Sequence, residues 1–424
     1  MDSSLVFAFG TLVLTVGCAV MRPKVRGFQF SPGSAAVLGV VVLLATNLLR
    51  PHDMVEAARV QWRPLLTLTC IMLMSGVVQE VGAFERLAAR IEARARSRTA
   101  VHTFTAVFVL SVITPSLLNN DAAILILTPL VVALTRRIFP GQPEVTMAFA
   151  FAVFLAPGVA PFIVSNPMNM IVAEYTGLRF NSYAAAMLPI SLAGAALTYL
   201  VLRVVYRNLL QSAKPVETGP IAPIARHPAE RPAVALLVLI FLSYPVAAAL
   251  GAEIWFVAAA GAVGSLVLAR VYRVAPMRKV GGHVSIDILA FLWGIFLVVK
   301  GLQHVGTVEW LASFYHSVGG GGVVQIAKIG VTSALGSAVI DNHPMSILNM
   351  MAIGANENPK LLLAALVGGD IGPRLLPIGS LAGLLWIDLL RRSGIRVGVG
   401  QFLCLGTIVL IPTIVLSLLM LWAL

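Results

Sequence analysis

Long apolar stretches follow one another from the first residues of the chain to the last. A helix of about 20 apolar residues crosses the hydrocarbon core of a bilayer, so each stretch is a candidate membrane span. Charged residues make up only 11% of the chain, whereas a soluble domain carries about 25%. We therefore expect an all-α polytopic membrane protein in contact with lipid. This composition excludes a soluble enzyme and a nucleic-acid-binding module.

The apolar stretches differ in how they are interrupted. We expect about ten transmembrane helices, near residues 4–21, 33–49, 63–81, 146–175, 183–209, 232–250, 252–270, 287–304, 360–390 and 398–424. Two further apolar pairs, 100–135 and 322–355, have polar triplets in their middle. A polar turn between apolar arms suits a re-entrant helical hairpin whose tip lies inside the protein at membrane depth. Charge alone does not separate this arrangement from one with more full spans.

The basic residues predict the orientation. The chain carries 30 Lys and Arg against 18 Asp and Glu, a formal net charge of +12. Cytoplasmic loops of membrane proteins are enriched in Lys and Arg. In the expected topology most of these residues fall on one side, beginning with Arg22, Lys24 and Arg26 after the first span. We therefore predict both termini on the outer side. No basic residue precedes the first span, which indicates an uncleaved helix rather than a signal peptide.

The two halves of the chain resemble each other. Residues 79–88 read QEVGAFERLA and residues 303–312 read QHVGTVEWLA, and an interrupted apolar pair follows each. With five spans in each half, the second half would be inverted. Inverted repeats with broken helices are typical of secondary transporters, which bind substrate near the midplane. The predicted parts are a first repeat over 1–210 with a cytoplasm-facing hairpin at 100–135, a cytoplasmic linker at 211–231, and a second repeat over 232–424 with an outward-facing hairpin at 322–355.

Four polar or proline-containing breaks are candidates for the transport site. Two are the hairpin tips, and two lie inside the spans 146–175 and 360–390, where proline and small polar residues unwind a helix. Inverted symmetry would bring the four together, and their helix ends and amides would supply hydrogen-bonding groups. The predicted substrate-binding residues are Asn119, Asn120, Asp121, Ser165, Asn166, Asn169, Asn342, His343, Ile378, Gly379 and Ser380.

Ionisable residues inside apolar segments are functional candidates because charge is costly in a membrane. We predict that Asp121 and Asp341 carry the coupled protons, with Asp370 as a third candidate. Asp370 and Arg374 are spaced i, i+4, so a structural ion pair on one helix face is also expected. His343 is a candidate ligand or proton carrier, or a local structural residue.

The sequence lacks recognisable catalytic and cofactor motifs. It has no zinc-protease, serine-hydrolase or nucleotide-binding-loop motif. Its three cysteines, Cys18, Cys70 and Cys404, lie far apart in apolar stretches. We therefore expect no enzyme activity, no metal and no cofactor. An ion gradient or a separate ATPase subunit would have to supply the energy for transport.

Three segments resemble the arsenite efflux permeases of the ArsB type, in the ion transporter superfamily. They run from Asn120 to Pro129 (NDAAILILTP), from Ser165 to Ile171 (SNPMNMI) and from Asp370 to Ala382 (DIGPRLLPIGSLA). The resemblance covers nearly the whole chain. It implies proton-coupled export of arsenite and antimonite across a bacterial inner membrane, by a mobile transport domain on a scaffold. It leaves room for a soluble arsenical-pump ATPase partner and for a homodimer.

The hairpin tips depart from the family pattern. The family usually has NNxP at the second tip, where this chain has Asp341-Asn342-His343-Pro344, and Ala-Asn-Asp at the first, where this chain has Asn119-Asn120-Asp121. The identity of the proton-carrying groups therefore stays open. A sodium–proton antiporter and a dicarboxylate or anion carrier of the same architecture remain alternatives. An intramembrane enzyme and a non-transporting metalloid sensor are alternatives of other classes.

Overall fold

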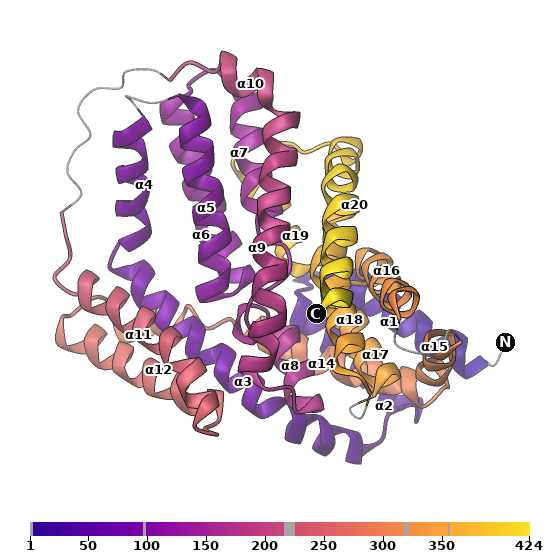
Figure 1. The fold of residues 1–424 in the computed structure, drawn as a ribbon. Coiled ribbons are helices and arrows are strands. Elements are labelled where there is room, and N and C mark those ends of the chain that lie inside the picture. The colour runs from indigo at the N-terminus through magenta and orange to yellow at the C-terminus, as the bar shows by residue number, and fades with distance from the viewer. Residues whose placement is uncertain (1–2, 96–98, 216–224, 318–321, 355–356) are drawn as a thin grey trace.

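The computed structural model describes the chain except for residues 1–2, 96–98, 216–224, 318–321 and 355–356 (Figure 1). Residues 216–224 of the predicted linker 211–231 and residue 355 of the predicted hairpin 322–355 therefore lie outside the described residues. The first half contains α1 (Ser3–Met21), a short antiparallel ribbon of β1 (Lys24–Val25) and β2 (Phe28–Gln29), α2 (Pro32–Ala45), α3 (Pro51–Glu80), α4 (Ala83–Ala95), α5 (Ala100–Leu118), α6 (Asn120–Ile138), α7 (Pro143–Leu155), the 3₁₀ turn η1 (Ile163–Ser165), α8 (Pro167–Thr176), α9 (Phe180–Val205) and α10 (Arg207–Ser212). The second half contains α11 (Glu230–Ala249), α12 (Ile254–Val271), α13 (Met277–Gly281), α14 (Ile286–Gln303), α15 (Thr307–His316), α16 (Val323–Ile340), α17 (Asn342–Ile353), α18 (Pro359–Ile371), the 3₁₀ turns η2 (Gly372–Arg374) and η3 (Pro377–Gly379), α19 (Leu381–Arg392) and α20 (Val399–Ala423).

The predicted fold class, an all-α polytopic membrane protein, is confirmed. Among the described residues, 8 helices are long and apolar enough to cross a membrane, or up to 9 if the bent pair α3 and α4 forms one span. The helices α5 and α16, which we predicted as hairpin arms, are among them. Two of the expected spans, 146–175 and 360–390, in which we predicted breaks, are divided into shorter helices. The count of about ten spans and the inverted repeats therefore stay predictions.

Both divided spans break where proline is concentrated. The chain leaves α7 after Leu155, passes Pro157 and Pro161, and becomes helical again at Pro167. The second break runs from Ile371 through the two 3₁₀ turns to α19. Proline lacks a backbone N–H and cannot continue a helix without a kink. The two breaks predicted from the sequence are therefore real interruptions of the helices.

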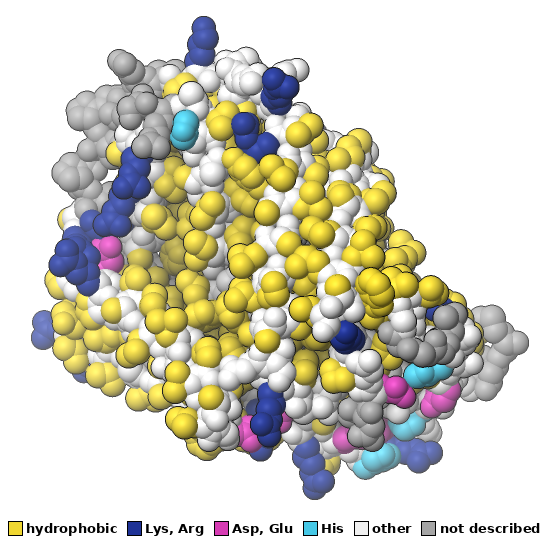
Figure 2. Space-filling model, in the orientation of Figure 1, with side chains coloured by type: hydrophobic (Ala, Val, Ile, Leu, Met, Phe, Trp, Pro, Cys, Tyr) yellow, Lys and Arg dark blue, Asp and Glu magenta, His cyan; other side chains and the backbone are white. Residues whose placement is uncertain are grey.

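The helices form two groups in Figure 1. In the upper group, α4 to α7 run roughly alongside α9 and α20, and α9 packs against α20. Below them α3 packs against α11 and α12, and α14 packs against α2. Figure 2 shows a surface that is apolar over its middle, with most charged side chains towards its margins. Such a surface suits a protein surrounded by lipid.

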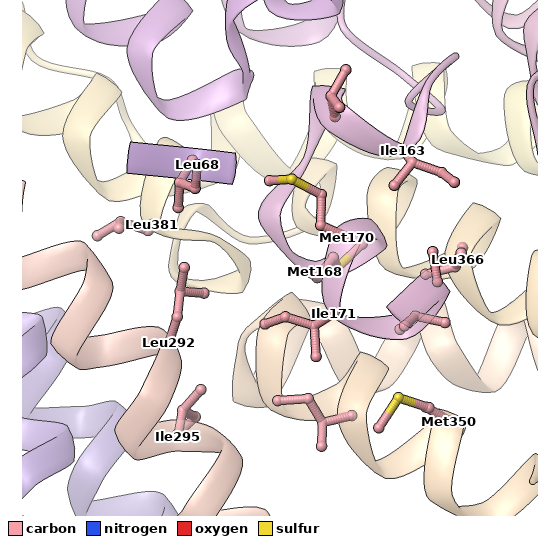
Figure 3. Packing of buried hydrophobic residues seen from close by; sticks show 14 of the residues in the cluster. Leu68, Ile163, Met168, Met170, Ile171, Leu292, Ile295, Met350, Leu366 and Leu381 are labelled. Atoms are coloured by element: carbon pink, nitrogen blue, oxygen red, sulfur yellow. The ribbon is translucent and has the colours of Figure 1, made fainter. Parts of the chain in front are cut away.

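The short helix α8 lies inside the protein. Its residues Pro167 to Ala173 are buried, and the helix packs against α3 and α17. Figure 3 shows Met168, Met170 and Ile171 among apolar side chains from other helices, including Leu366 and Met350. Methionine side chains are flexible and fill irregular gaps of this kind. The packing fixes the depth of Asn166, which directly precedes α8.

Small residues bring α16 and the second broken span into close contact. A Cβ added at Gly368 would lie 2.7 Å from the Cβ of Ser333, and one at Gly372 would lie 2.9 Å from the Cα of Ala334. Gly379 likewise faces Ser337. We call this contact the α16–α18 seam. Because it leaves no space for side chains, the two segments must be positioned together.

Candidate functional site

The four breaks surround a cavity of about 40 Å³. A cavity of roughly 10–15 Å³ holds one water molecule, so this one has room for a few waters or a very small ligand. It is lined by Asn120, Asp121, Ile124, Phe154, Pro157, Asn166, Asn342, His343, Asp370, Pro373, Arg374, Ser380 and Ala382. Each break contributes at least one predicted polar residue to this set. The residues come from both halves of the chain.

The two tips have similar local geometry, with positive φ and an N-capping side chain at each. Asn119 has φ 121° and ψ 163°, and Asp341 has φ 77° and ψ 147°. Each side chain accepts a hydrogen bond of 2.9 Å from a backbone N–H of the next helix, that of Ala122 and that of His343 respectively. Such N-caps satisfy free N–H groups at a helix start. Asn119 and Asp341 therefore hold the tips, while the residues that follow them face the cavity.

A carboxyl group joins the two broken spans. Asn166 Nδ2 donates a 2.9 Å hydrogen bond to Asp370 Oδ1, and the backbone N–H of Ala160 donates a 2.8 Å bond to Asp370 Oδ2. The amide oxygen of Asn166 caps α8 through the N–H of Met168. Ser380 caps α19 through the N–H of Gly383. Polar side chains thus satisfy the helix ends at the cavity and also line it.

The predicted ion pair between Asp370 and Arg374 is not formed. Arg374, only 3% exposed, donates instead to the carbonyl oxygens of Leu155 (2.6 Å) and Pro157 (3.3 Å) and to Thr413 Oγ1 (3.0 Å). The spacing argument failed because α18 ends at Ile371 and the chain turns into a 3₁₀ segment. The guanidinium therefore binds the break after α7 to α20.

Five of the predicted substrate-binding residues do not line the cavity, and the N-cap residue Asn119 is one of them. Ser165 Oγ donates to the Ser116 carbonyl at 3.1 Å, and Asn169 Nδ2 donates to the Tyr183 hydroxyl at 2.7 Å. Tyr183 in turn donates to the Ala160 carbonyl at 2.8 Å. Ile378 and Gly379 lie in η3 and are not part of the lining. The hydrogen bonds of Ser165 and Asn169 thus stabilise the first broken span, which carries the lining residue Asn166.

Our prediction missed several lining residues. Phe154, Pro157 and Pro373 are part of the wall. A signal for Pro157 existed, since residues 156–161 read APGVAP and extend the break upstream of Ser165. Phe154 gave no signal, because it sits in an unbroken apolar run.

Some polar atoms at the cavity have no protein partner. Asn342 Oδ1, His343 Nε2 and Arg374 Nε are buried without a hydrogen bond to any described residue. The Asp121 carboxylate, on a residue that is 5% exposed, accepts no hydrogen bond from any described residue. His343 Nδ1 lies 2.9 Å from Asp341 Oδ1. Because buried polar groups are nearly always satisfied, these atoms are available to a bound ligand or to water.

The sequence matches the family model "Arsenical pump membrane protein" (ArsB) over residues 5–424. The chain belongs to the ArsB family. The arsenical pump membrane protein of Escherichia coli is 28% identical over 430 residues, which cover 98% of this chain and 97% of the relative. The putative arsenical pump membrane protein of Bacillus subtilis is 24% identical over 406 residues, covering 90% of this chain and 91% of the relative.

Two solved transporters share the fold. The Alcanivorax borkumensis YdaH transporter is similar with a TM-score of 0.55 and 17% identity, covering 100% of this chain and 97% of that one. Neisseria gonorrhoeae MtrF gives a TM-score of 0.53 and 12% identity, covering 99% and 95%. The resemblance noted in the sequence is therefore confirmed. This ArsB-family chain is a multi-pass membrane transporter and not an enzyme.

Proposed function

We propose that the protein exports trivalent metalloid hydroxides, arsenite and antimonite, across a bacterial inner membrane in exchange for protons. The observation that carries the proposal is the cavity where the four breaks meet. The relatives of this chain are named as arsenical pump membrane proteins. In this proposal both termini lie on the outer side, and the pH gradient alone drives export. A soluble ATPase partner and a homodimer are compatible with it but not required.

The cavity suits a small neutral hydroxide. Arsenous acid is uncharged near neutral pH and presents three hydroxyl groups, each a donor and an acceptor. The amides of Asn120, Asn166 and Asn342 and the ring of His343 offer both kinds of partner. Capture by thiolates would need clustered sulfurs. Within the part of the chain that the structure describes, no group of three or more His, Cys, Asp or Glu side chains is placed so that it could hold a metal ion.

Asp121 is the best-placed group to carry a proton. Its carboxylate lines the cavity and has no hydrogen-bond donor among the described residues. An ionised carboxylate without a partner is costly inside a membrane. Either a proton or a hydroxyl group of the substrate can satisfy the Asp121 carboxylate, so binding of one would compete with binding of the other. The Asp341 carboxyl group is already hydrogen-bonded to the His343 ring, and Asp370 already accepts two hydrogen bonds. These two carboxyl groups are the second and third candidates.

The deciding experiment uses everted membrane vesicles that contain this protein alone. With a pH gradient, acid inside, we expect arsenite accumulation that a protonophore abolishes and that does not depend on sodium. Sodium-dependent dissipation of the pH gradient without arsenite accumulation would overturn the proposal in favour of an antiporter.

The proton assignment has its own test. Asp121→Asn and Asp341→Asn should each reduce pH-driven accumulation at least tenfold. Asp388→Asn is the matched control, because Asp388 pairs with Arg391 and Arg392 at the end of α19, away from the cavity. If the Asp121 and Asp341 variants both transport like the wild type, these carboxyl groups do not carry the protons.

A further inference from the structure

A second and larger cavity lies on the flank of the molecule. It has a volume of about 730 Å³ and lies between α5, α11 and the bend that joins α3 to α4. Its walls are mostly aliphatic, with Leu110, Ile113 and Leu117 on α5 facing Val234 and Val238 on α11. We call this cavity the α5–α11 groove. It is separate from the transport cavity, with which it shares no lining residue.

Part of the groove wall is directly accessible from outside. Val238 is 40% exposed, Leu239 is 60% exposed and Leu242 is 61% exposed. Apolar side chains that are exposed on a membrane-spanning helix, such as those on α11, face lipid tails. The aliphatic part of the groove is therefore open to acyl chains.

The groove also carries a group of positive charges. Arg90 on α4, Arg226 before α11 and Arg231 at the start of α11 contribute to its lining. Glu230 is the acidic residue of the lining, and it is already bound by Arg86 at 2.5 Å, with Arg226 at 3.5 Å. Arg90 and Arg231 form no ion pair with any described residue. The groove thus combines an aliphatic wall with an excess of positive charge.

We propose that the α5–α11 groove binds an anionic phospholipid, with its acyl chains along α5 and α11 and its phosphate at Arg90 and Arg231. Arginine forms bidentate hydrogen bonds with phosphate oxygens. Basic pockets between helices on the cytoplasmic side of membrane proteins suit anionic headgroups, and the predicted topology places these arginines on that side. A zwitterionic lipid would fill the apolar wall equally well but would gain less from the arginines.

The position of the groove gives the lipid a structural role. Leu117 and Leu118 line the groove and directly precede Asn119, which holds the first tip of the transport cavity. The opposite wall belongs to α11, which packs against α3 and α12. A lipid in the groove would therefore touch both the hairpin and the helices beside it.

Native mass spectrometry of the purified full chain tests the proposal, with phosphatidylglycerol, phosphatidylcholine and glycerol 3-phosphate as probes. Wild type should bind phosphatidylglycerol most tightly. At roughly 1 kcal/mol for each basic residue near a headgroup, Arg90→Gln/Arg231→Gln should weaken that binding about 30-fold. Arg270→Gln/Arg278→Gln, exposed basic residues outside the groove, is the matched control and should change nothing.

A second pair of variants tests the apolar wall. Val238→Trp should fill the groove and reduce phosphatidylglycerol binding, while Val263→Trp, on the exposed face of α12 outside the groove, should not. Equal binding of the two lipids, or equal losses in the groove and control variants, would overturn the proposal. Displacement of the lipid by glycerol 3-phosphate at similar concentration would show a site for free phosphate esters instead. None of these readouts depends on arsenite transport.

Discussion

A 2.9 Å hydrogen bond joins the Asn166 side-chain amide to the Asp370 carboxyl group, across 204 positions of sequence. It links the start of α8 to the last turn of α18, so each broken span fixes the other. Asp370 also accepts from the N–H of Ala160 in the break after α7. The wall of the cavity between the four breaks therefore depends on one carboxyl group that accepts from two donors.

Replacing that carboxyl group by an amide should damage the site. In Asp370→Asn, one side-chain oxygen becomes an NH₂ group that faces a donor, so one hydrogen bond is lost and a donor is left unsatisfied. We expect a loss of about 1–3 kcal/mol in stability and a large loss of arsenite transport. Thermal unfolding of the purified protein and vesicle uptake measure the two effects. Wild-type values for both in Asp370→Asn and in Asn166→Ala would contradict this assignment.

Arg374 should be irreplaceable by lysine. Its planar guanidinium group donates hydrogen bonds to Leu155, Pro157 and Thr413 at the same time. The ammonium group of a lysine, on a flexible alkyl chain, does not reproduce this geometry. We expect Arg374→Lys to unfold at a clearly lower temperature than the wild type. Lys24→Arg, on an exposed residue of β1, is a control that keeps the charge. A variant Arg374→Lys as stable as this control would show that charge alone suffices.

The backbone at the first tip predicts an unusual order of variants. With φ at 121° and ψ at 163°, Asn119 lies in a region that nearly all residues except glycine avoid, at a cost of about 1–3 kcal/mol. Asn119→Gly should relieve that strain while losing the cap, whereas Asn119→Ala keeps the strain and loses the cap. We therefore expect Asn119→Gly to be the more stable of the two in thermal unfolding. The reverse order would mean that the tip does not have this conformation.

The α16–α18 seam should tolerate no added volume. A methyl group at Gly372 would collide with the backbone of Ala334, and overpacking of this kind costs about 1–3 kcal/mol. Gly372→Ala should therefore fold poorly or unfold early, as judged by fluorescence-detected size exclusion after heating. Gly10→Ala in α1, where nothing lies within 4 Å, should be neutral. Equal behaviour of the two variants would refute the close contact.

The sequence predicted the fold class and the positions of the breaks because both depend on local features. Apolar length identifies a membrane helix, and a polar or proline interruption shows where it ends. The helix starts at Asn120 and Asn342 follow directly from the polar triplets. The split of the spans 146–175 and 360–390 likewise follows from proline.

Side-chain partners could not be predicted in the same way, since they come from distant segments. Asn169 and Ser165 looked like ligands but bind Tyr183 and Ser116. The i, i+4 spacing of Asp370 and Arg374 assumed a continuous helix, and the helix ends between them. Phe154 became a lining residue only through the packing of α7. Residue type and spacing thus indicated the region of the cavity but not the inward-facing set.

The α16–α18 seam also limits how the chain can diverge. Gly368 and Gly372 meet Ser333 and Ala334 at contact distance, so a larger residue on one side is tolerated only with a compensating change on the other. We therefore expect the positions of Gly368 and Gly372 to covary with those of Ser333 and Ala334 among related sequences. The exposed residues Val331, Leu335 and Val339 of α16 are free to vary singly.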